Sequence, residues 1–270
     1  MNPIELVSRN GATRAWIDPH GGGIQGLEVD GCPIVDGYPA GQPAPHAAGA
    51  VLFPWPNRVR DGRWRLDGEE QQLTIDEPER NNANHGLVRS RPFDVNHVSP
   101  HLARLRISVS GDPGYPFEVD LTIIYRALND GLHVRTAVEN LGTRRAPVAL
   151  GFHPYLRIGD VPMHDLVLEV PAGQVLDLDE RLLPNGSRPA EPRHLSLSGA
   201  VLNHCYGGLD VVDGQIHHRL RAPDGRCVEL RADETYRWLQ VYTCPDVPRA
   251  GELTSSSSSV ALEPLTSSRP

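Results

Sequence analysis

Apolar residues occupy every second position in several stretches of this chain, and that alternation predicts β-strands. The clearest stretch is LRISVS at residues 105–110, and residues 119–125 and 132–138 repeat its period. Residues 228–231 and 238–243 read the same way. A period of two indicates antiparallel sheets in which one face of each strand is buried.

Turn signals separate these stretches. Asp-Gly favours tight hairpins, because glycine accepts positive φ and aspartate caps its own turn. No stretch has the convincing period of an amphipathic helix. The sequence therefore predicts an all-β protein, a large antiparallel β-sandwich built as one domain from residues 1–270. The Asp-Gly pairs occur at positions 30–31, 36–37, 61–62, 67–68, 130–131, 213–214 and 224–225.

A run of serines, Ser255–Ser259, interrupts this pattern just before the apolar stretch that begins at Val260. Serine homopolymers are typically flexible, because their composition gives them nothing to bury in a core. We therefore expect flexible chain over the serine run.

Composition and charge exclude several classes of protein. The formal net charge of the 270 residues is −8, which argues against a nucleic-acid partner. No run of about 18 apolar residues is present, so we expect no membrane span, and the first residues lack a signal-peptide pattern. The four cysteines are scattered without a CxxC motif, which predicts no metal site and favours free thiols in the cytoplasm.

The alternation in residues 148–153 separates two unlike faces. Ala149, Gly151 and His153 share one face, and the bulky apolar residues share the other. Because two of its three side chains are very small, we interpret the histidine face as open to a ligand. The opposite face is expected to be buried, and it carries Val148, Leu150 and Phe152.

Two further stretches have the same design. Glu263 shares a face with the small residue Ala261, and Gln240 lies opposite an apolar pair in residues 238–242. If these strands are neighbours of the one before His153, the sheet presents a shallow cleft with an acid, a base and aromatic walls. A single histidine or glutamate on a sheet is usually only solvated. The small neighbours, repeated on two strands, favour a site that suits a sugar.

Five motifs in order resemble the aldose 1-epimerase (galactose mutarotase) family, over roughly Trp16 to Thr266. The family fold is a large antiparallel β-sandwich, in agreement with the alternation. The five motifs are Phe53-Pro54-Trp55-Pro56-Asn57-Arg58-Val59-Arg60-Asp61-Gly62, Asn84-His85-Gly86-Leu87, Gly151-Phe152-His153-Pro154-Tyr155, Leu239-Gln240-Val241-Tyr242-Thr243 and Ala261-Leu262-Glu263-Pro264.

The resemblance implies a role for each matching residue. His153 matches the general acid of the family and Glu263 its general base. Arg58, His85 and Gln240 match residues that bind sugar hydroxyls. His85 would orient the ligand from a loop at the rim of the cleft, with Gly86 letting the backbone approach the sugar.

The sequence departs from the family pattern in two places. Where the family usually has a sugar-binding aspartate, this chain offers Asn203, an amide without charge. Asp210 lies nearby in sequence as a second candidate for that role. After Glu263-Pro264 the family continues with a further turn and strand, whereas this sequence stops at Pro270.

The implied activity is the interconversion of α and β anomers of a hexose by acid–base ring opening. That chemistry needs no metal or organic cofactor, and the protein would act on a sugar as a monomer or a homodimer. A first alternative is an enzyme for a phosphorylated or otherwise modified sugar, for which extra cations at the rim are available. They are Arg58, Arg60, Arg89 and Arg91. A second alternative is a non-catalytic sugar-binding or sensing protein.

Overall fold

The computed structural model describes residues 2–190, 193–248 and 256–268, and nearly all of its regular elements are strands. A 12-stranded antiparallel sheet forms the centre of the molecule. In the order of their pairing, ten of its strands are β1 (Ile4–Val7), β2 (Thr13–Ile17), β3 (Ile24–Val29), β4 (Cys32–Val35), β15 (Tyr155–Leu156), β24 (Ser256–Leu265), β23 (Trp238–Pro248), β20 (Asn203–Leu209), β17 (Ala172–Leu178) and β18 (Pro184–Pro189). Two short strands extend it: β14 (Gly151–Phe152) pairs with β24, and β5 (Val51–Leu52) pairs with β14.

Smaller sheets cover the large one. One four-stranded sheet has the order β10 (Asp94–Ser99), β11 (Leu102–Val109), β12 (Val119–Leu128) and β13 (Gly131–Asn140). The other has the order β19 (His194–Ser196), β16 (Val167–Glu169), β21 (Gln215–Arg221) and β22 (Cys227–Asp233). Two short ribbons pair β6 (Arg58–Arg60) with β9 (Asn82–Asn84), and β7 (Arg63–Leu66) with β8 (Glu69–Gln72). The helical turns are η1 (Pro45–Ala47) and η2 (Met163–Asp165).

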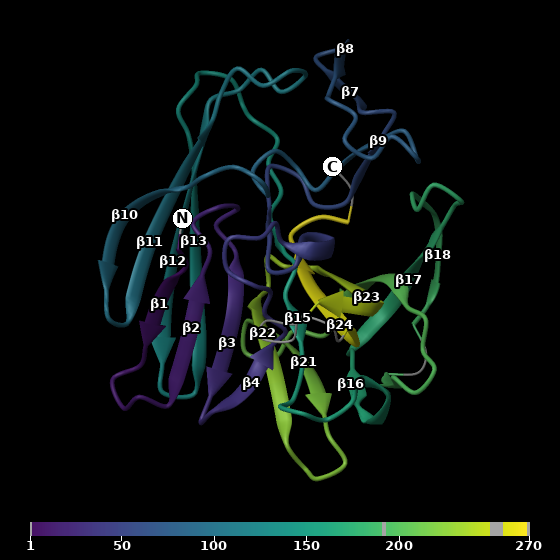
Figure 1. Cartoon of the computed structure of the whole chain (residues 1–270). Helices are drawn as coiled ribbons and strands as arrows, with labels where there is room; N and C mark the ends of the chain where they lie inside the picture. Colours follow the sequence, from purple (N-terminus) through teal and green to yellow (C-terminus); the bar gives the residue numbers. More distant parts are fainter. Residues whose placement is uncertain (1, 191–192, 249–255, 269–270) are drawn as a thin grey trace.

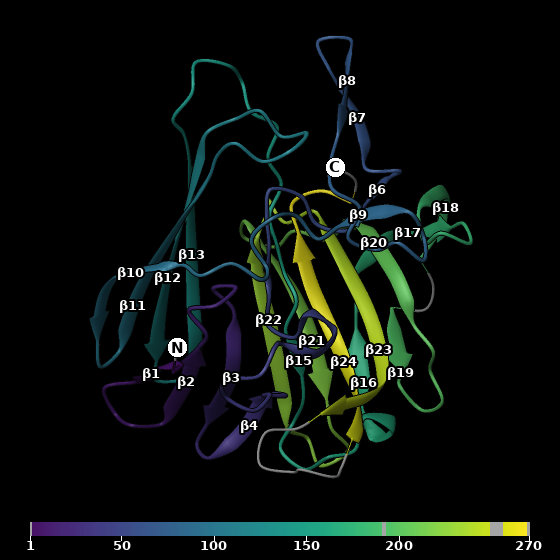
Figure 2. The same ribbon diagram turned by 45° about the horizontal axis from the view of Figure 1, so that its top comes forward.

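The four-stranded sheets divide the core into two parts. Inward residues of β11 and β12 pack against β1 and β2, at the purple and teal side of Figures 1 and 2. Leu168 and Leu220, from β16 and β21, pack against the C-terminal strands of the large sheet. The antiparallel β-sandwich predicted by the alternation is confirmed. Among the described residues, no helix is both long and apolar enough to cross a membrane.

The Asp-Gly signal marks hairpins at some positions and fails at another. Asp30-Gly31 and Asp67-Gly68 have positive φ at both residues, and each joins two consecutive paired strands. Asp36-Gly37 does not form a hairpin, because β4 pairs onward with β15 instead of turning back. The Asp36 side chain is buried, where it accepts hydrogen bonds from Arg157 and Ser259.

The expected flexibility of the serine run is wrong for residues 256–259, which form the first part of β24. Their backbone pairs with β23 across the register Cys244↔Ser259. The Ser259 side chain is buried and donates its hydroxyl to Asp36. A polar homopolymer is therefore ordered here by a neighbouring strand and a buried carboxylate. Ser255 lies outside the described residues.

Candidate active site

The strands that carry the predicted site residues are neighbours in the large sheet. Glu263 of β24 lies directly opposite Gln240 of β23. Asn203 begins the next strand, β20, and its Oδ1 accepts a hydrogen bond from Gln240 Nε2 at 2.8 Å. His153 lies between β14 and β15, which both pair with β24. The structure therefore brings together the histidine, the glutamate and both amides.

His153 and Glu263 form the centre of the site. His153 Nε2 lies 3.3 Å from Glu263 Oε1. The histidine ring also contacts two other rings, with centroids 5.2 Å from Tyr155 and 5.7 Å from His85. The carboxylate thus has an imidazole partner, and aromatic groups surround the imidazole.

The face expected to be open is closed. His153 is 5% exposed and Glu263 2% exposed. The space beside Gly151 is filled, because an added Cβ would lie 2.5 Å from Leu265 Cδ2. On the opposite face, Phe152 is buried as expected, but Val148 is 44% exposed. The alternation therefore separated the two faces correctly near Phe152, while it did not reveal that loops and β24 cover the histidine.

Glu263 is incompletely satisfied. Its Oε1 contacts His153, whereas its Oε2 is buried without a hydrogen-bond partner among the described residues. The Oδ1 of Asn84, on the ribbon beside the site, is also buried and has no hydrogen-bond partner among the described residues. An unsatisfied buried acceptor costs about 1–3 kcal/mol, so such groups call for an explanation. A hydroxylated ligand would supply the missing donors.

Burial also determines where the proton of the pair resides. It raises the pKa of Glu263 to about 8, against a smaller lowering by Arg58. It lowers the pKa of His153 to about 4. In both residues the cause is desolvation of the charged form. Near neutral pH the pair therefore consists of a protonated Glu263 and a neutral His153.

The β6–β9 ribbon supplies Arg58 and His85. Arg58 pairs with Asn84 across the ribbon, and His85 follows directly with a φ of 61°. His85 Nδ1 accepts a hydrogen bond from the Asn57 backbone N–H at 3.3 Å, and the side chain is 9% exposed. Burial is the main reason that the pKa of His85 is lowered well below its usual value. His85 is therefore a neutral, buried member of the site.

Glycine is required at position 86 by a contact inside the protein, in addition to the approach to a sugar that the sequence suggested. Its φ is +75°, and an added Cβ would lie 2.2 Å from the Phe53 carbonyl oxygen. That carbonyl accepts the backbone N–H of Leu87 at 2.7 Å. The close backbone approach at Gly86 is made to Phe53, which locks the two loop motifs together.

Asp210 is far from the position that the family aspartate would occupy. It follows the last residue of β20, whereas Asn203 is the first. Seven residues of extended chain span about 23 Å. Asp210 is also ion-paired with Arg193 at the surface. Of these two residues, only Asn203 is hydrogen-bonded to another candidate site residue, Gln240, among the described residues.

A cavity of about 460 Å³ adjoins Arg58 but excludes the acid–base pair. Its walls are mainly apolar and include Trp55, Trp64 and Tyr115. His153 and Glu263 do not line it, so the cavity is adjacent to the candidate chemistry and separate from it. No group of three or more potential metal ligands occurs among the described residues.

The antiparallel sandwich and the buried imidazole–carboxylate pair together define a class, a β-sandwich protein with a candidate acid–base site. Comparison with known proteins narrows that class. The family model of aldose 1-epimerase matches residues 5–267. The chain belongs to the aldose 1-epimerase family, a family of isomerases.

Sequence relatives and solved structures agree with this assignment. The uncharacterized protein YihR of Escherichia coli (strain K12) is 31% identical over 265 residues, covering 94% of this chain and 81% of that protein. Human galactose mutarotase is 29% identical over 238 residues, covering 77% of this chain and 65% of that protein. A GalM/aldose epimerase homologue from C. elegans shares the fold, with a TM-score of 0.82 at 16% identity over 97% of this chain and 89% of that one.

Proposed function

We propose that this protein is a mutarotase, which interconverts the α and β anomers of a hexose. The observation that carries the proposal is the buried contact between His153 and Glu263, in which Glu263 Oε2 has no hydrogen-bond partner among the described residues. Anomer exchange needs one acid and one base close to the same C1–O5 unit, and two ionisable side chains 3.3 Å apart support that assignment.

Ring opening requires two proton movements. The Glu263 carboxylate removes the proton of the C1 hydroxyl, and the His153 imidazolium delivers a proton to the ring oxygen. The C1–O5 bond breaks, the aldehyde rotates about C1–C2, and the ring closes on the other face with the roles reversed. Arg58, His85, Asn203 and Gln240 hold the sugar hydroxyls.

Near neutral pH the His153–Glu263 pair already contains the one proton that these steps need. It resides on Glu263, and its transfer across the 3.3 Å contact to His153 Nε2 produces the carboxylate–imidazolium pair. The net charge of the pair does not change, so the transfer itself requires no proton from solvent. Sugar hydroxyls that donate to Glu263 would favour the ionised form of the carboxylate.

The pH dependence tests this description of the pair. We expect a bell-shaped profile of kcat/KM with limits near pH 4 and pH 8, the pKa values of His153 and Glu263. Below the lower limit both groups are protonated and no base remains. Above the upper limit the shared proton is lost and no acid remains. Polarimetry at each pH, corrected for the buffer-catalysed rate, measures the profile, and activity that rises steadily through pH 9 would contradict it.

A modified, anionic sugar is less well supported as the substrate. The four arginines that would attract it all have carboxylate partners, so their charges are already compensated. The pairs are Arg58–Glu77, Arg60–Asp179, Arg89–Asp76 and Arg91–Asp112.

Polarimetry with freshly dissolved α-D-galactose or α-D-glucose separates the enzyme from a sugar-binding module. We expect acceleration of the approach to anomeric equilibrium in proportion to protein concentration. Sugar binding without any acceleration would contradict the proposed activity and favour the sugar-binding module.

Asn203→Asp tests the substitution of the family aspartate. Asn203 Oδ1 accepts a hydrogen bond from Gln240, and a carboxylate can accept the same bond. Because charge-assisted hydrogen bonds are stronger than neutral ones, we expect the variant to bind an unmodified hexose about threefold to thirtyfold more tightly. Titration of both proteins with galactose measures Kd. Equal Kd values at equal thermal stability would show that Asn203 does not contact the sugar.

A further inference from the structure

Arg58 is held by a carboxylate that the sequence motifs did not single out. Arg58 Nη2 donates to Glu77 Oε1 at 2.8 Å, and Arg58 Nε donates to Glu77 Oε2 at 2.9 Å. This two-point contact fixes the plane of the guanidinium. The Nη1 group of Arg58 has no partner among the residues that the structure describes, so it is available to a ligand.

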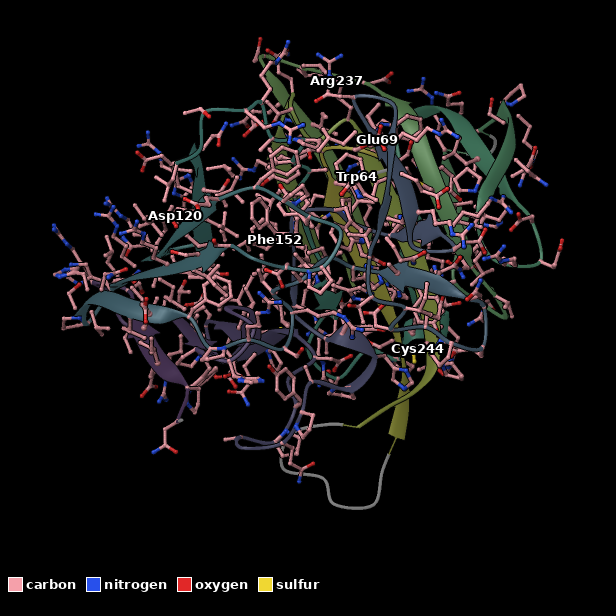
Figure 3. The ribbon with its side chains drawn as sticks, turned by 90° about the horizontal axis from the view of Figure 1, so that it is seen from above. Trp64, Glu69, Asp120, Phe152, Arg237 and Cys244 are labelled. Carbon is pink, nitrogen blue, oxygen red and sulfur yellow. The ribbon has the colours of Figure 1, made fainter. Side chains whose placement is uncertain are left out.

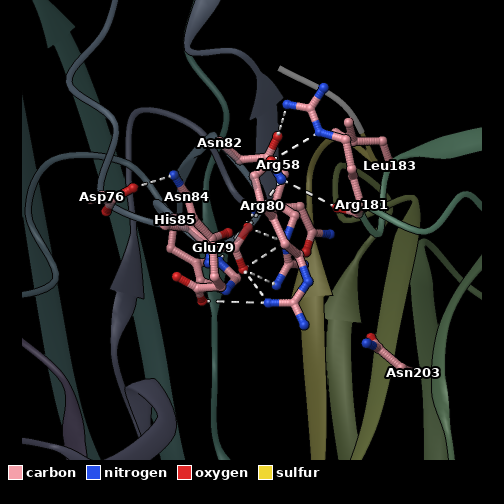
Figure 4. A network of polar contacts seen from close by, with 12 residues as sticks. Arg58, Asp76, Glu79, Arg80, Asn82, Asn84, His85, Arg181, Leu183 and Asn203 are labelled. Carbon is pink, nitrogen blue, oxygen red and sulfur yellow. Dashed lines mark hydrogen bonds and ion pairs between the residues drawn. The ribbon is translucent and has the colours of Figure 1, made fainter.

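A second layer of contacts holds Glu77 in turn, and Figure 4 labels Arg58, Asn82 and Arg181 of this network. Asn82, which is fully buried, donates from Nδ2 to Glu77 Oε2 at 3.0 Å. Arg181, from the loop between β17 and β18, donates to Asn82 Oδ1 at 3.1 Å and to the Asn81 carbonyl at 2.9 Å. The loop that precedes His85 is therefore tied to the large sheet through the same network that orients Arg58.

Stability alone is a weak explanation for this arrangement. The Glu77 side chain is 8% exposed and that of Arg58 is 15% exposed. Burial alone raises the pKa of Glu77, but hydrogen bonds from Arg58 and Asn82 outweigh it and hold that pKa below its usual value. Glu77 is thus charged at neutral pH. Buried ion pairs often add little to stability compared with apolar packing, so orientation of the guanidinium is the better explanation.

We propose that Glu77 is a positioning residue of the site, which holds the Arg58 guanidinium in the orientation that binds a sugar hydroxyl. The inference rests on the proposed function, because the sugar contact of Arg58 belongs to it. Glu77 itself does not touch the sugar and acts only through Arg58.

Glu77→Gln is the first test. The amide keeps the shape of the side chain but removes the charge and one acceptor oxygen. Because a hydrogen bond to a charged group is weakened, we expect KM for galactose to rise about tenfold to a hundredfold. We expect kcat to change by less than about threefold, since His153 and Glu263 are untouched. Glu79→Gln, two residues away with a side chain 64% exposed, is the matched control and should leave both constants unchanged. Glu79 and Glu77 both contact Arg80, so this control also tests whether the Arg80 contact matters for binding.

A double-mutant cycle distinguishes positioning from general support of the fold. Arg58→Gln should raise KM, and adding Glu77→Gln to it should raise KM no further. The double variant also removes the buried charge of Glu77, which in Arg58→Gln alone would keep its contact with Arg80 at 3.3 Å and its hydrogen bond from Asn82. An equal factor from Glu77→Gln in both backgrounds, or an unchanged KM in the single variant, would overturn the proposal. If Arg58→Gln does not fold, the KM and kcat of Glu77→Gln decide by themselves.

Direct binding separates this proposal from the proposed function. Kd for galactose is measured by calorimetry for the wild type, Glu77→Gln and Glu79→Gln. A wild-type protein that binds without accelerating mutarotation would contradict the enzyme activity alone, and a weaker Kd in Glu77→Gln would still support the positioning role. Equal Kd values for Glu77→Gln and the wild type would overturn that role whatever the activity.

Discussion

Replacing Glu263 with glutamine is expected to slow catalysed mutarotation by about 10²- to 10⁴-fold, because a positioned base typically contributes that much. Glutamine has nearly the same shape and cannot accept a proton at neutral pH. His153→Ala is expected to have an effect of similar size, since the pair works through one shared proton. Polarimetry on fresh α-D-galactose measures both rates, and near wild-type activity in either variant would remove that residue from the proposed mechanism.

Glu263→Gln is expected to increase stability while it reduces activity. A stability measurement therefore separates loss of catalysis from misfolding. The folded-state pKa of Glu263, about 8, is above its ordinary value of 4.5. Between these values the unfolded chain loses its proton first, so the stability of the wild type falls as pH rises. Glutamine does not ionise, so its stability does not fall in this pH range. We therefore expect the unfolding free energy of the variant to exceed that of the wild type by on the order of a few kcal/mol at pH 8.

Thermal melts at two pH values check the stability effect. The Glu263→Gln variant should melt at a higher temperature than the wild type at pH 8, and close to the wild type near pH 4.5. Glu234→Gln, at an exposed position, should match the wild type at both pH values and is the control. A variant that is inactive and also less stable at pH 8 would mean that Glu263 supports the fold.

Phe152→Ala is expected to cost about 3–5 kcal/mol of unfolding free energy, because truncation of a buried aromatic ring leaves a cavity. Phe152 is 7% exposed and belongs to the core shared by the β10–β13 sheet and the N-terminal strands. Its ring centroid lies 6.5 Å from that of Tyr236, with the two rings tilted by 40°. Seen from above, it lies toward the middle of the molecule (Figure 3). Urea unfolding followed by circular dichroism measures the change.

Val148→Ala is the matched control for Phe152→Ala. The alternation assigns both residues to one face, but Val148 is 44% exposed. We expect a change within about 0.5 kcal/mol for Val148→Ala, as for most surface substitutions. An effect on stability as large as that of Phe152→Ala would mean that the two residues are equally buried in solution.

Local pattern was sufficient for the buried faces of β11, β12 and β23. Alternation predicted residues 105–110 and 119–125, which lie in β11 and β12 except for Ser110. It also placed Leu239 with Val241 on one face, and both belong to the core behind the large sheet. These predictions succeed because side-chain direction in a strand depends only on the parity of the position.

Predictions that depended on a distant partner failed. Asp36-Gly37 is a strong hairpin signal, yet β4 pairs with β15, more than a hundred residues away. Residues 256–259 have the composition of a flexible linker, yet β23 and Asp36 hold them in a strand. In both places long-range pairing outweighs the local preference, and a short sequence window contains no information about that partner.

The sequence by itself determined which residues could form the site. Period and motif order identified His153, Glu263 and Gln240, and the family resemblance added Asn203; the structure places them on adjacent strands or directly beside them. Only the tertiary structure decided that the pair is covered, that its resting proton resides on Glu263, and that Glu77 holds Arg58. A pKa depends on how much water surrounds a group, and an ion pair depends on where two loops meet. Both properties arise from segments that fold over the strands, and the alternation along any one strand does not contain them.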